Sequence, residues 1–569
     1  MQTTDIHFRF FFFDAAAKRT DDIRYLQFWS TYIPFTTKTS DGTGMTSLHW
    51  ACTEGKSFAI IQYILSSSPD ATSSLLELRD DSGCTPLLLA AQHGNVETVA
   101  YLVHQYHARL DALDDNGDSA THWAAYKGAA DVLGLLAYYE KQDSSPSSGV
   151  STAQPAPDML QKPDAYGQTP LHLAALRGHS SACQYILRQI AGQRNENRRD
   201  ALQILSMPDK NGRTPYALAV HKQKPHTAAV LQQAERTLTL GSSRQAWIPR
   251  NQKELQNLVQ VVVVDWLCNS HKWRQWMGIP TGVDDPMDVA PSFPNYYVFL
   301  QIVLNAWFSF SVYVPVFNLG KGVLWDYTGM HVTQFILLCL TSFFLYKTQT
   351  TNPGRLDDSC PEINFWRKLY GDILASYADN DKDSIAKRDQ LKLCHTSHIA
   401  RPPRSKYDRA TGACVLLFDH NCPFVGNTVG LYNYKWFYLF LLCMTWYFIN
   451  HIILLFIYCS RAKDLSFLTI GMGIYLAIHV FMAGGMFIYH TQLTAVNLTT
   501  NEHINVNRYD YLWTSGNGSA KRFHNPWNRG ILANFADRLN PSHASYMLPE
   551  SQERLLSSSG NPKSALEMV

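Results

Sequence analysis

The stretch Gly167-Gln-Thr-Pro-Leu-His-Leu-Ala-Ala175 decides the fold of the first half of the chain, because close variants of it recur. The variants begin at Gly83, Gly117 and Gly212, and Gly44 opens a fifth copy. A threonine before proline can cap a helix, and proline fits the first helical turn, where its missing amide hydrogen is not needed. The recurring phrase therefore predicts an array of short helical repeats.

The recurring phrase resembles the ankyrin repeat, in which a turn is followed by two helices. The interval from Gly83 to Gly117 is close to the ankyrin period of about 33 residues. The next interval is longer and contains a Ser-, Pro- and Gln-rich stretch, Gln142 to Pro163, which we interpret as a loop insertion. The resemblance predicts an ankyrin solenoid over residues 1–240, with a degenerate N-terminal cap at Phe13–Tyr32.

Three histidines, His49, His122 and His172, occupy the same place in the recurring phrase. A shared place in a repeat favours a local hydrogen-bonding role for these side chains over metal binding. An ankyrin stack presents an extended concave surface that binds other proteins. We therefore expect the array to choose partner proteins and not to carry out chemistry.

The composition of the whole chain excludes some classes of function. Lys+Arg 49 against Asp+Glu 47 give a net charge of +2, so no overall basic character favours a nucleic-acid partner. The 11 cysteines are scattered and odd in number, which does not suit a secreted disulfide framework. We expect these cysteines to face a reducing cytosol or to lie within a membrane, with few disulfide pairs.

Four apolar segments in the second half are long enough to cross a bilayer, which takes about 20 helical residues. Tyrosine, tryptophan or basic residues bound these segments, as is typical of membrane interfaces. We therefore predict an all-α fold, in which the ankyrin solenoid is followed by a four-span membrane domain with a cytosolic, cysteine-containing loop. The predicted spans are Tyr296–Phe317, Tyr327–Tyr346, Trp436–Tyr458 and Phe467–Tyr489.

The four spans define the remaining segments and the topology. An even number of spans places the ankyrin half, the loop between spans two and three, and the C-terminal tail on one side of the membrane. That loop is rich in lysine and arginine and the opposite loops are short, so positive-inside bias makes this side cytosolic. Val261–Cys268 is apolar but too short to span, and we interpret it as an interfacial or packing helix. The predicted domains are residues 1–240 (ankyrin repeats), 241–292 (linker), 293–347 (spans one and two), 348–435 (loop), 436–490 (spans three and four) and 491–569 (tail).

The loop ends in Asp419-His-Asn-Cys422-Pro-Phe-Val-Gly-Asn427, shortly before the third predicted span. A cysteine thiol has a pKa near 8.5, so its attack on a thioester at neutral pH needs a neighbouring base. His420 can be that base, and Asp419 can hold the imidazole in the right tautomer and stabilise its cationic form. Cys422 is then the predicted nucleophile.

This segment, including Asn427, resembles the Asp-His-His-Cys core of the DHHC palmitoyltransferase family. Asn352-Pro-Gly354 stands where the family has Asp-Pro-Gly, and Thr499-Thr500-Asn-Glu502 matches its Thr-Thr-x-Glu motif. The ankyrin repeats narrow the resemblance to the ankyrin-bearing branch, which includes fungal members. The resemblance implies a protein-cysteine S-palmitoyltransferase of Golgi or endosomal membranes. Such an enzyme would transfer a fatty acyl group from palmitoyl-CoA to cysteines of substrate proteins, which the ankyrin repeats recruit.

Relatives with the full motif hold two zinc ions in this loop, each bound by three cysteines and one histidine. Only Cys394 and Cys414 retain a ligand of that type here, and we expect both to be buried thiols. Serine, tyrosine, threonine and asparagine are poor zinc ligands, so we predict no metal site and no cofactor beyond the acyl-CoA substrate. The equivalent positions are Cys394, Ser397, Tyr407 and Cys414 for the first site, and Asp408, Thr411, Asn421 and Thr428 for the second.

Two other interpretations remain open at the level of the sequence. One is a membrane-anchored ankyrin scaffold whose transferase has decayed, which the loss of zinc ligands favours. The joint presence of Asp419, His420 and Cys422 argues against it. The other is an ankyrin-bearing channel or transporter, suggested by His451 and His479 within the spans. This chain has four predicted spans, and the join between the last two is too short to contain a selectivity filter.

Overall fold

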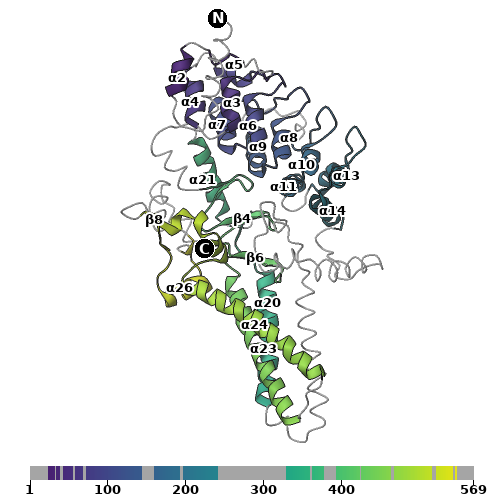
Figure 1. The fold of residues 1–569 in the computed structure, drawn as a ribbon, viewed down its shortest axis with the longest axis vertical. Coiled ribbons are helices and arrows are strands. Elements are labelled where there is room, and N and C mark those ends of the chain that lie inside the picture. Colours follow the sequence, from purple (N-terminus) through teal and green to yellow (C-terminus); the bar gives the residue numbers. More distant parts are fainter. Residues whose placement is uncertain are drawn as a thin grey trace. The chain divides into compact units, whose positions relative to one another are not determined.

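Figure 1 shows the computed structural model of the chain, whose elements belong to two compact units. One unit comprises Met1–Asp288 and Asn364–Ala400, and the other comprises Val289–Ile363 and Arg401–Val569. The structure describes residues 24–31, 34–38, 43–54, 58–67, 72–143, 159–192, 197–240, 328–358, 360, 362–376, 392–422, 424–462, 467–515, 521–542 and 545–546. The predicted first span, the linker 241–292 with its interfacial segment, and much of the predicted cap and loop insertion lie outside these residues.

The recurring phrase begins the first helix of each ankyrin repeat. Helix α6 (Pro86–His93) follows Thr85, whose Oγ1 accepts a hydrogen bond from the amide of Leu88 at 3.4 Å. Gly94 ends α6 with a φ of 78°, a left-handed conformation that favours glycine. The other helices of this unit are α2 (Arg24–Ser30), α3 (Ser47–Glu54), α4 (Phe58–Ser66), α5 (Thr72–Glu77), α7 (Val96–Tyr106), α8 (Ala120–Lys127), α9 (Ala130–Asp143), α10 (Pro170–Arg177), α11 (Ser180–Ala191), α12 (Arg198–Ser206), α13 (Pro215–His221) and α14 (Pro225–Leu240).

The three histidines of the recurring phrase link each repeat to the next. His172 Nδ1 accepts a hydrogen bond from the amide of Thr169 at 3.2 Å, and Nε2 donates to the carbonyl of Met207 at 3.0 Å. His49 and His122 make the same pair of contacts, with Nε2 lying 3.1 and 3.2 Å from a carbonyl of the following repeat. All three side chains are buried. The predicted hydrogen-bonding role of these histidines is confirmed.

A helix from the second half of the chain packs in the ankyrin unit. This helix is α21 (Ile363–Ala375), which lies in the predicted cytosolic loop. Its Tyr370 and Leu374 are buried in one hydrophobic cluster with ankyrin side chains. The Tyr370 ring meets the ring of Tyr138 in α9 edge to face, with centroids 5.0 Å apart.

A short hairpin packs beside α21 in the same unit. It consists of β2 (Leu393–Cys394) and β3 (Ile399–Ala400). His398 Nε2 donates a hydrogen bond to the carbonyl of Gly134 in α9 at 2.7 Å. A Cβ atom at Gly134 would lie 2.1 Å from the carbonyl oxygen of His395, so the hairpin approaches α9 at a point where only glycine fits. Part of the predicted loop is therefore integrated into the ankyrin array.

Within its described residues, the other unit contains three helices that are long and apolar enough to cross a membrane. They are α20 (Thr328–Thr350), α23 (Tyr434–Ala462) and α24 (Phe467–Ala495), and α23 contacts both of the others. Large apolar side chains such as Phe335 and Phe481 are mostly exposed, as suits a surface in contact with lipid. The three helices correspond to the second, third and fourth predicted spans.

Short strands surround the motif and distinguish the fold from the predicted all-α class. The chain is mostly helical, but the loop and the tail contain antiparallel pairs of two or three residues. Strands this short show no clear alternation of apolar and polar residues, so the sequence pattern does not reveal them. The remaining elements are β1 (Arg355–Leu356), β4 (Lys406–Asp408), β5 (Ala413–Val415), β6 (His420–Cys422), β7 (Asn427–Val429), α25 (Thr500–Ile504), η5 (Val506–Arg508), η6 (Asp510–Leu512), β8 (Trp513–Ser515), β9 (Lys521–Phe523) and α26 (Ile531–Leu539).

Candidate active site

The predicted nucleophile and base lie on the hairpin formed by β6 and β7. In this hairpin His420 pairs with Val429 and Cys422 pairs with Asn427. The amide of Gly426 donates a hydrogen bond to the carbonyl of Cys422 at 2.9 Å, and the φ of 71° at Gly426 closes the turn. The hairpin leads directly into α23, so it fixes Cys422 near the start of a membrane helix.

The three predicted catalytic side chains contact one another in sequence. His420 Nδ1 lies 2.8 Å from Asp419 Oδ1, and the His420 side chain also makes a hydrogen bond to that of Cys422. The Asp419 carboxylate is buried, whereas about a fifth of the His420 side chain is exposed, at 22%. The carboxylate therefore orients the imidazole from the inside, and the imidazole contacts the thiol.

Two further groups hold the Asp419 carboxylate. Arg538 of α26 donates from a terminal nitrogen to Oδ2 at 2.7 Å, and the Thr500 amide donates to the same oxygen at 3.3 Å. The Arg538 guanidinium lies over the ring of Tyr434, 3.8 Å from its centroid. Burial alone would raise the pKa of Asp419, but the hydrogen bond from His420 and the charge of Arg538 outweigh it and hold this pKa below its usual range. Asp419 is therefore ionised at neutral pH.

The charge on Asp419 determines the protonation state of His420. Burial would lower the pKa of His420, but the hydrogen bonds to Asp419 and Cys422, together with their charges, raise it to about 10. An imidazole with this pKa holds a proton at neutral pH. The arrangement therefore favours an imidazolium next to the sulfur of Cys422, which stabilises the thiolate.

The Thr-Thr-x-Glu motif begins α25 and is joined to the loop. Thr499 and Glu502 form a reciprocal capping box: the Glu502 amide donates to Thr499 Oγ1 at 3.1 Å, and the Thr499 amide donates to Glu502 Oε2 at 2.9 Å. Thr500 and the following residue, Asn501, donate their amides to Asp419, through its carboxylate and its carbonyl respectively. The start of α25 thus supports Asp419 from the side of the tail.

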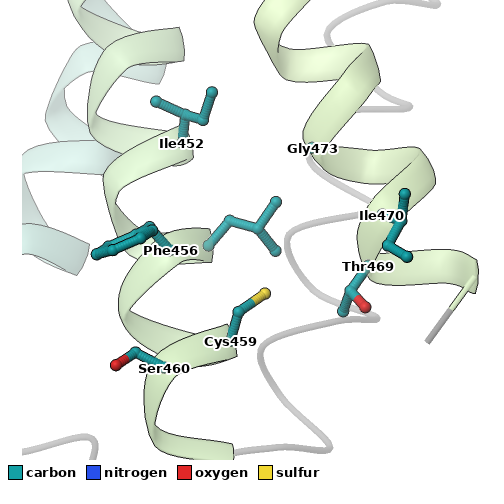
Figure 2. A pocket seen from close by; sticks show the side chains of 8 residues that line it. Ile452, Phe456, Cys459, Ser460, Thr469, Ile470 and Gly473 are labelled. Carbon is teal, nitrogen blue, oxygen red and sulfur yellow. The ribbon is translucent and has the colours of Figure 1, made fainter. Parts of the chain in front are cut away.

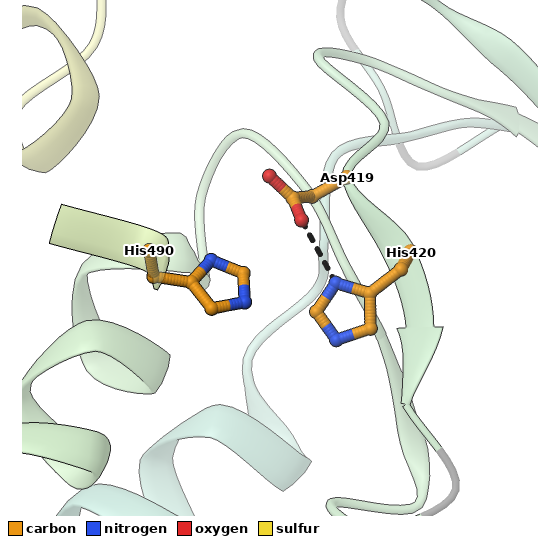
Figure 3. A group of neighbouring side chains, drawn as sticks. All are labelled: Asp419, His420 and His490. Carbon is orange, nitrogen blue, oxygen red and sulfur yellow. Dashed lines mark hydrogen bonds and ion pairs between the residues drawn. The ribbon is translucent and has the colours of Figure 1, made fainter. Parts of the chain in front are cut away.

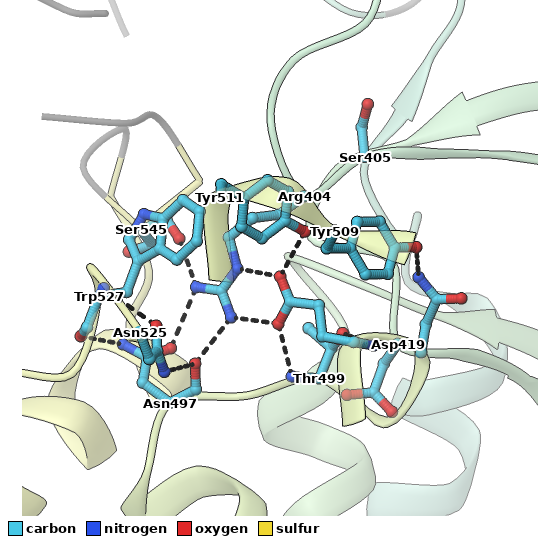
Figure 4. A network of polar contacts seen from close by, with 12 residues as sticks. Arg404, Ser405, Asp419, Asn497, Thr499, Tyr509, Tyr511, Asn525, Trp527 and Ser545 are labelled. Carbon is cyan, nitrogen blue, oxygen red and sulfur yellow. Dashed lines mark hydrogen bonds and ion pairs between the residues drawn. The ribbon is translucent and has the colours of Figure 1, made fainter. Parts of the chain in front are cut away.

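Arg404 is the centre of the polar network in Figure 4. Its guanidinium forms a bidentate ion pair with Glu502, with N–O distances of 2.7 and 2.8 Å, and both side chains are buried. It also donates to the side-chain and main-chain oxygens of Asn497 and to the carbonyl of Ser545. The guanidinium lies over the ring of Trp527 as well. Arg404 of the loop therefore binds two separate segments of the tail, one at Asn497 and Glu502 and the other at Ser545.

Asn427 connects the motif to the end of a membrane helix. Its side-chain amide donates to the carbonyls of Thr348, Gln349 and Thr351, at 3.0 to 3.2 Å. The last carbonyls of a helix have no partner within the helix, so Asn427 caps α20 from outside. Asn433 adds a hydrogen bond to the Thr348 carbonyl at 3.3 Å.

His490 of α24 lies beside the predicted catalytic residues, although it was not singled out from the sequence. Figure 3 shows its ring next to the Asp419 carboxylate and to the ring of His420, and the ring centroids of the two histidines are 5.6 Å apart. Ligand atoms of these three residues lie within 4.8 Å of one another. The carboxylate, however, already binds the Arg538 cation through one oxygen and His420 through the other. These contacts fit an ion-pair site better than a metal site.

An apolar hollow between α23 and α24 lies away from the motif (Figure 2). Phe456, Cys459, Ile470 and Gly473 are among its lining residues. Cys459 is roughly 40 Å along α23 from the helix start that follows the motif, at about 1.5 Å per residue. This hollow is therefore not part of the candidate active site.

Arg404 and Arg538 contribute to the site but were not predicted from the sequence. Each pairs with an acidic residue about a hundred positions away in the chain. A single sequence does not distinguish a buried arginine from an exposed one, because only the fold shows which acidic side chain lies next to it. The local sequence contains no signal for Arg538, because the buried side chains of α26 are Asn534 and Arg538, whereas its apolar Ile531 and Leu532 are exposed.

Comparisons with known proteins agree with both halves of this description. Residues 387–507 match the DHHC palmitoyltransferase family, residues 48–147 match ankyrin repeats in three copies, and residues 166–201 match a further ankyrin repeat. The chain is 34% identical over 229 residues to "Probable protein S-acyltransferase 5" of Arabidopsis thaliana, which covers 35% of this chain and 44% of that protein.

Two further relatives match a shorter stretch. "Palmitoyltransferase ZDHHC9" of Homo sapiens is 36% identical over 152 residues, covering 25% of this chain and 39% of the relative. "Probable protein S-acyltransferase 1" of Arabidopsis thaliana is 30% identical over 155 residues, covering 26% and 42% respectively. The chain thus spans less than half the length of these curated relatives. Together with the motif and its geometry, these matches identify a DHHC palmitoyltransferase domain joined to an N-terminal array of ankyrin repeats.

Proposed function

We propose that this protein is a protein-cysteine S-acyltransferase whose nucleophile is Cys422. The observation that carries the proposal is the geometry at His420, which lies between the buried Asp419 carboxylate at 2.8 Å and the Cys422 side chain. A carboxylate, an imidazole and a thiol in this order form a site for covalent acyl transfer.

In the first half-reaction the imidazole of His420 already holds the proton of Cys422, and the thiolate of this ion pair attacks the carbonyl carbon of the acyl-CoA thioester. Asp419, held in place by Arg538, stabilises the imidazolium. The bond between the carbonyl carbon and the CoA sulfur then breaks, and the departing sulfur takes the proton from His420. Cys422 is left as an S-acyl thioester.

In the second half-reaction a cysteine of a substrate protein gives its proton to His420 and attacks the acyl carbonyl. The bond to Cys422 breaks, and the Cys422 sulfur leaves as a thiolate next to the imidazolium. The starting pair of imidazolium and thiolate is thereby restored. The reaction should therefore show ping-pong kinetics.

The surroundings of the site support a long-chain acyl donor and a protein acceptor. Cys422 lies shortly before α23, so the acyl chain can lie among membrane helices while CoA remains in water. Ankyrin repeats provide a surface that recruits substrate proteins. We place the repeats, the loop and both termini in the cytosol, in a four-span protein of Golgi or endosomal membranes. The reaction needs no cofactor beyond the acyl-CoA.

The proposal is tested by incubating the purified protein with a labelled palmitoyl-CoA analogue and measuring hydroxylamine-sensitive label on the chain. We expect Cys422→Ala to abolish the label. Cys339→Ala is the matched control, because Cys339 is an exposed cysteine of α20 outside the motif, and this variant should be labelled like the wild type.

Equal label on folded wild type and on Cys422→Ala would contradict the transferase proposal. The alternative, a membrane-anchored ankyrin scaffold with a decayed transferase, would then account for the retained repeats. Label that disappears in Cys339→Ala would instead identify nonspecific acylation of an exposed thiol.

A further inference from the structure

The four positions equivalent to the second zinc site of the family lie together in this structure. Asp408 ends β4, and Thr411 lies in the turn between β4 and β5. Asn421 and Thr428 face each other across the β6–β7 hairpin as paired residues. None of the four has a cysteine or histidine side chain, yet direct hydrogen bonds join them.

The Asp408 carboxylate is the centre of this cluster. Thr428 donates from its hydroxyl to Oδ2 at 2.6 Å, and the amide of Thr411 donates to the same oxygen at 3.1 Å. The amide of Ala410 donates to Oδ1 at 3.2 Å. The Asn421 side-chain amide donates to the Thr428 hydroxyl at 3.3 Å. Asp408 and Thr428 are both buried, so water does not compete for these contacts.

This set of donors does not fit zinc. A structural zinc ion is bound by four thiolate, imidazole or carboxylate ligands in a tetrahedron. Here one carboxylate is present, and both of its oxygens already accept hydrogen bonds. Threonine hydroxyls and an asparagine amide are neutral and weak ligands. The chemistry of the second site is therefore that of an anion surrounded by hydrogen-bond donors.

The first site has the same deficiency in its chemistry. Ser397 and Tyr407 replace two of its four ligands, and Cys394 and Cys414 are buried in β2 and β5. The Cys394 sulfur lies 3.1 Å from the hydroxyl of Thr396. Two thiols alone do not complete a tetrahedral site.

We propose that the Asp408 hydrogen-bond cluster replaces the second zinc ion as the link between the β4–β5 turn and the β6–β7 hairpin. Asn421 is the residue between His420 and Cys422, and successive side chains of a strand point to opposite faces. The cluster therefore holds one face of β6 while His420 and Cys422 project from the other. The charge-assisted hydrogen bond of 2.6 Å from Thr428 to Asp408 is strong enough to hold the β6–β7 hairpin against the β4–β5 turn in a buried site.

This inference concerns folding and does not depend on the transferase activity. Its first test is the metal content of the purified full chain, measured by inductively coupled plasma mass spectrometry, together with its thermal midpoint. We expect well under one zinc per chain and the same midpoint with and without a strong zinc chelator. Near-stoichiometric zinc whose removal lowers the midpoint would overturn the proposal.

A pair of matched variants tests the cluster itself. Thr428→Val removes the hydroxyl that donates to the carboxylate, and we expect the thermal midpoint to fall by several degrees. Thr411→Ser keeps both the backbone amide that contacts the carboxylate and the hydroxyl that donates to the Asp408 carbonyl, so its midpoint should stay close to that of the wild type. Equal midpoints for the two variants would overturn the role of the Thr428 hydroxyl.

A fourfold replacement tests whether the cluster occupies the place of a metal. Asp408→Cys, Thr411→Cys, Asn421→His and Thr428→Cys together install a tetrahedral ligand set at the four positions. We expect the purified fourfold variant to bind about one zinc per chain and to become sensitive to the chelator. A fourfold variant that takes up no zinc would overturn the equivalence of the cluster and a metal site.

Discussion

At the scale of single residues, Asp419 is where most contacts of the site converge. Its carboxylate accepts hydrogen bonds from His420, Arg538 and the amide of Thr500, and its carbonyl accepts one from the amide of Asn501. Because the carboxylate is buried, loss of a charged partner leaves a charge that water cannot solvate. Asp419 therefore depends on residues from the tail as much as on its neighbour in the motif.

Replacing Arg538 should show this dependence. We expect Arg538→Gln to lower the free energy of unfolding by about 3–5 kcal/mol, because it leaves the Asp419 carboxylate buried without its cationic partner. Thermal melts in detergent would measure the loss. The matched control is Arg529→Gln. Arg529 forms a partly exposed ion pair with Asp537, so we expect its loss to change the free energy of unfolding by less than about 1 kcal/mol. Equal losses in the two variants would contradict the account of Asp419.

The raised pKa of His420 predicts an unusual pH profile for acyl-enzyme formation. A free thiol with a pKa near 8.5 would react about tenfold faster for each pH unit between 6 and 8. His420 keeps its proton until the pH approaches its raised pKa of about 10, and Asp419 stays ionised because its pKa is lowered. The imidazolium is then present beside Cys422 throughout that range. We expect the initial labelling rate to change less than about threefold from pH 6 to 8, measured in stopped-time assays. A rate that rises about tenfold per unit would contradict the ion pair.

At the scale of secondary-structure elements, the site is assembled from pieces that cap one another. Asn427 in the β6–β7 hairpin binds the last carbonyls of α20, and Thr499 and Glu502 cap the start of α25. Arg404 of the loop then binds Glu502 of that cap. Each polar helix end thus serves as an attachment point for another segment.

The cap on α20 can be removed by one substitution. Asn427→Ala deletes three hydrogen bonds to partly buried helix-end carbonyls, so we expect a loss of about 1–3 kcal/mol in the free energy of unfolding. Thr350→Val is the control, since its exposed hydroxyl bonds only to a carbonyl of its own helix and should cost under about 0.5 kcal/mol. Thermal melts of both variants decide the matter. A loss in Asn427→Ala no larger than that of the control would argue against capping.

The contact between α9 and the β2–β3 hairpin rests on a glycine. Gly134→Ala places a methyl group 2.1 Å from the carbonyl oxygen of His395, so we expect the hairpin to separate from α9. Hydrogen–deuterium exchange of residues 392–400 should increase in this variant. Gly471→Ala meets open space in α24, where alanine favours the helix, and should leave exchange of the hairpin unchanged. Unaltered exchange in Gly134→Ala would contradict the contact.

At the scale of the whole molecule, the features that the sequence predicts are those that local patterns encode. The repeat phrase, the long apolar runs and the Asp419–Cys422 motif are each contained in a short window. The phrase, the motif and the last three of the four predicted runs appear where the sequence places them, and the first run lies outside the described residues. The repeat histidines could also be interpreted correctly, because three of the five copies of the phrase place a histidine at the same position. Periodicity and motif spacing thus account for the helices and for the clustering of the proposed catalytic side chains.

The features that the sequence does not predict depend on contacts between distant segments. Arg404 meets Glu502 and Arg538 meets Asp419 only after the tail has folded against the loop. The attachment of α21 to the ankyrin unit depends on matching aromatic surfaces, including Tyr370, that carry no periodic signal. Strands of two or three residues are set by their partners and not by their own composition. A single sequence contains these residues but not their pairing.

The central claim is that Cys422 forms the acyl-enzyme. The most direct measurement is peptide mass spectrometry of the wild-type protein after brief incubation with palmitoyl-CoA, without reducing agent, so that each cysteine is scored for a thioester. Our account predicts a single dominant acyl group, on the peptide that contains Cys422, which disappears when a thiol acceptor is added. Acyl groups spread over the exposed cysteines, with none on Cys422, would contradict it.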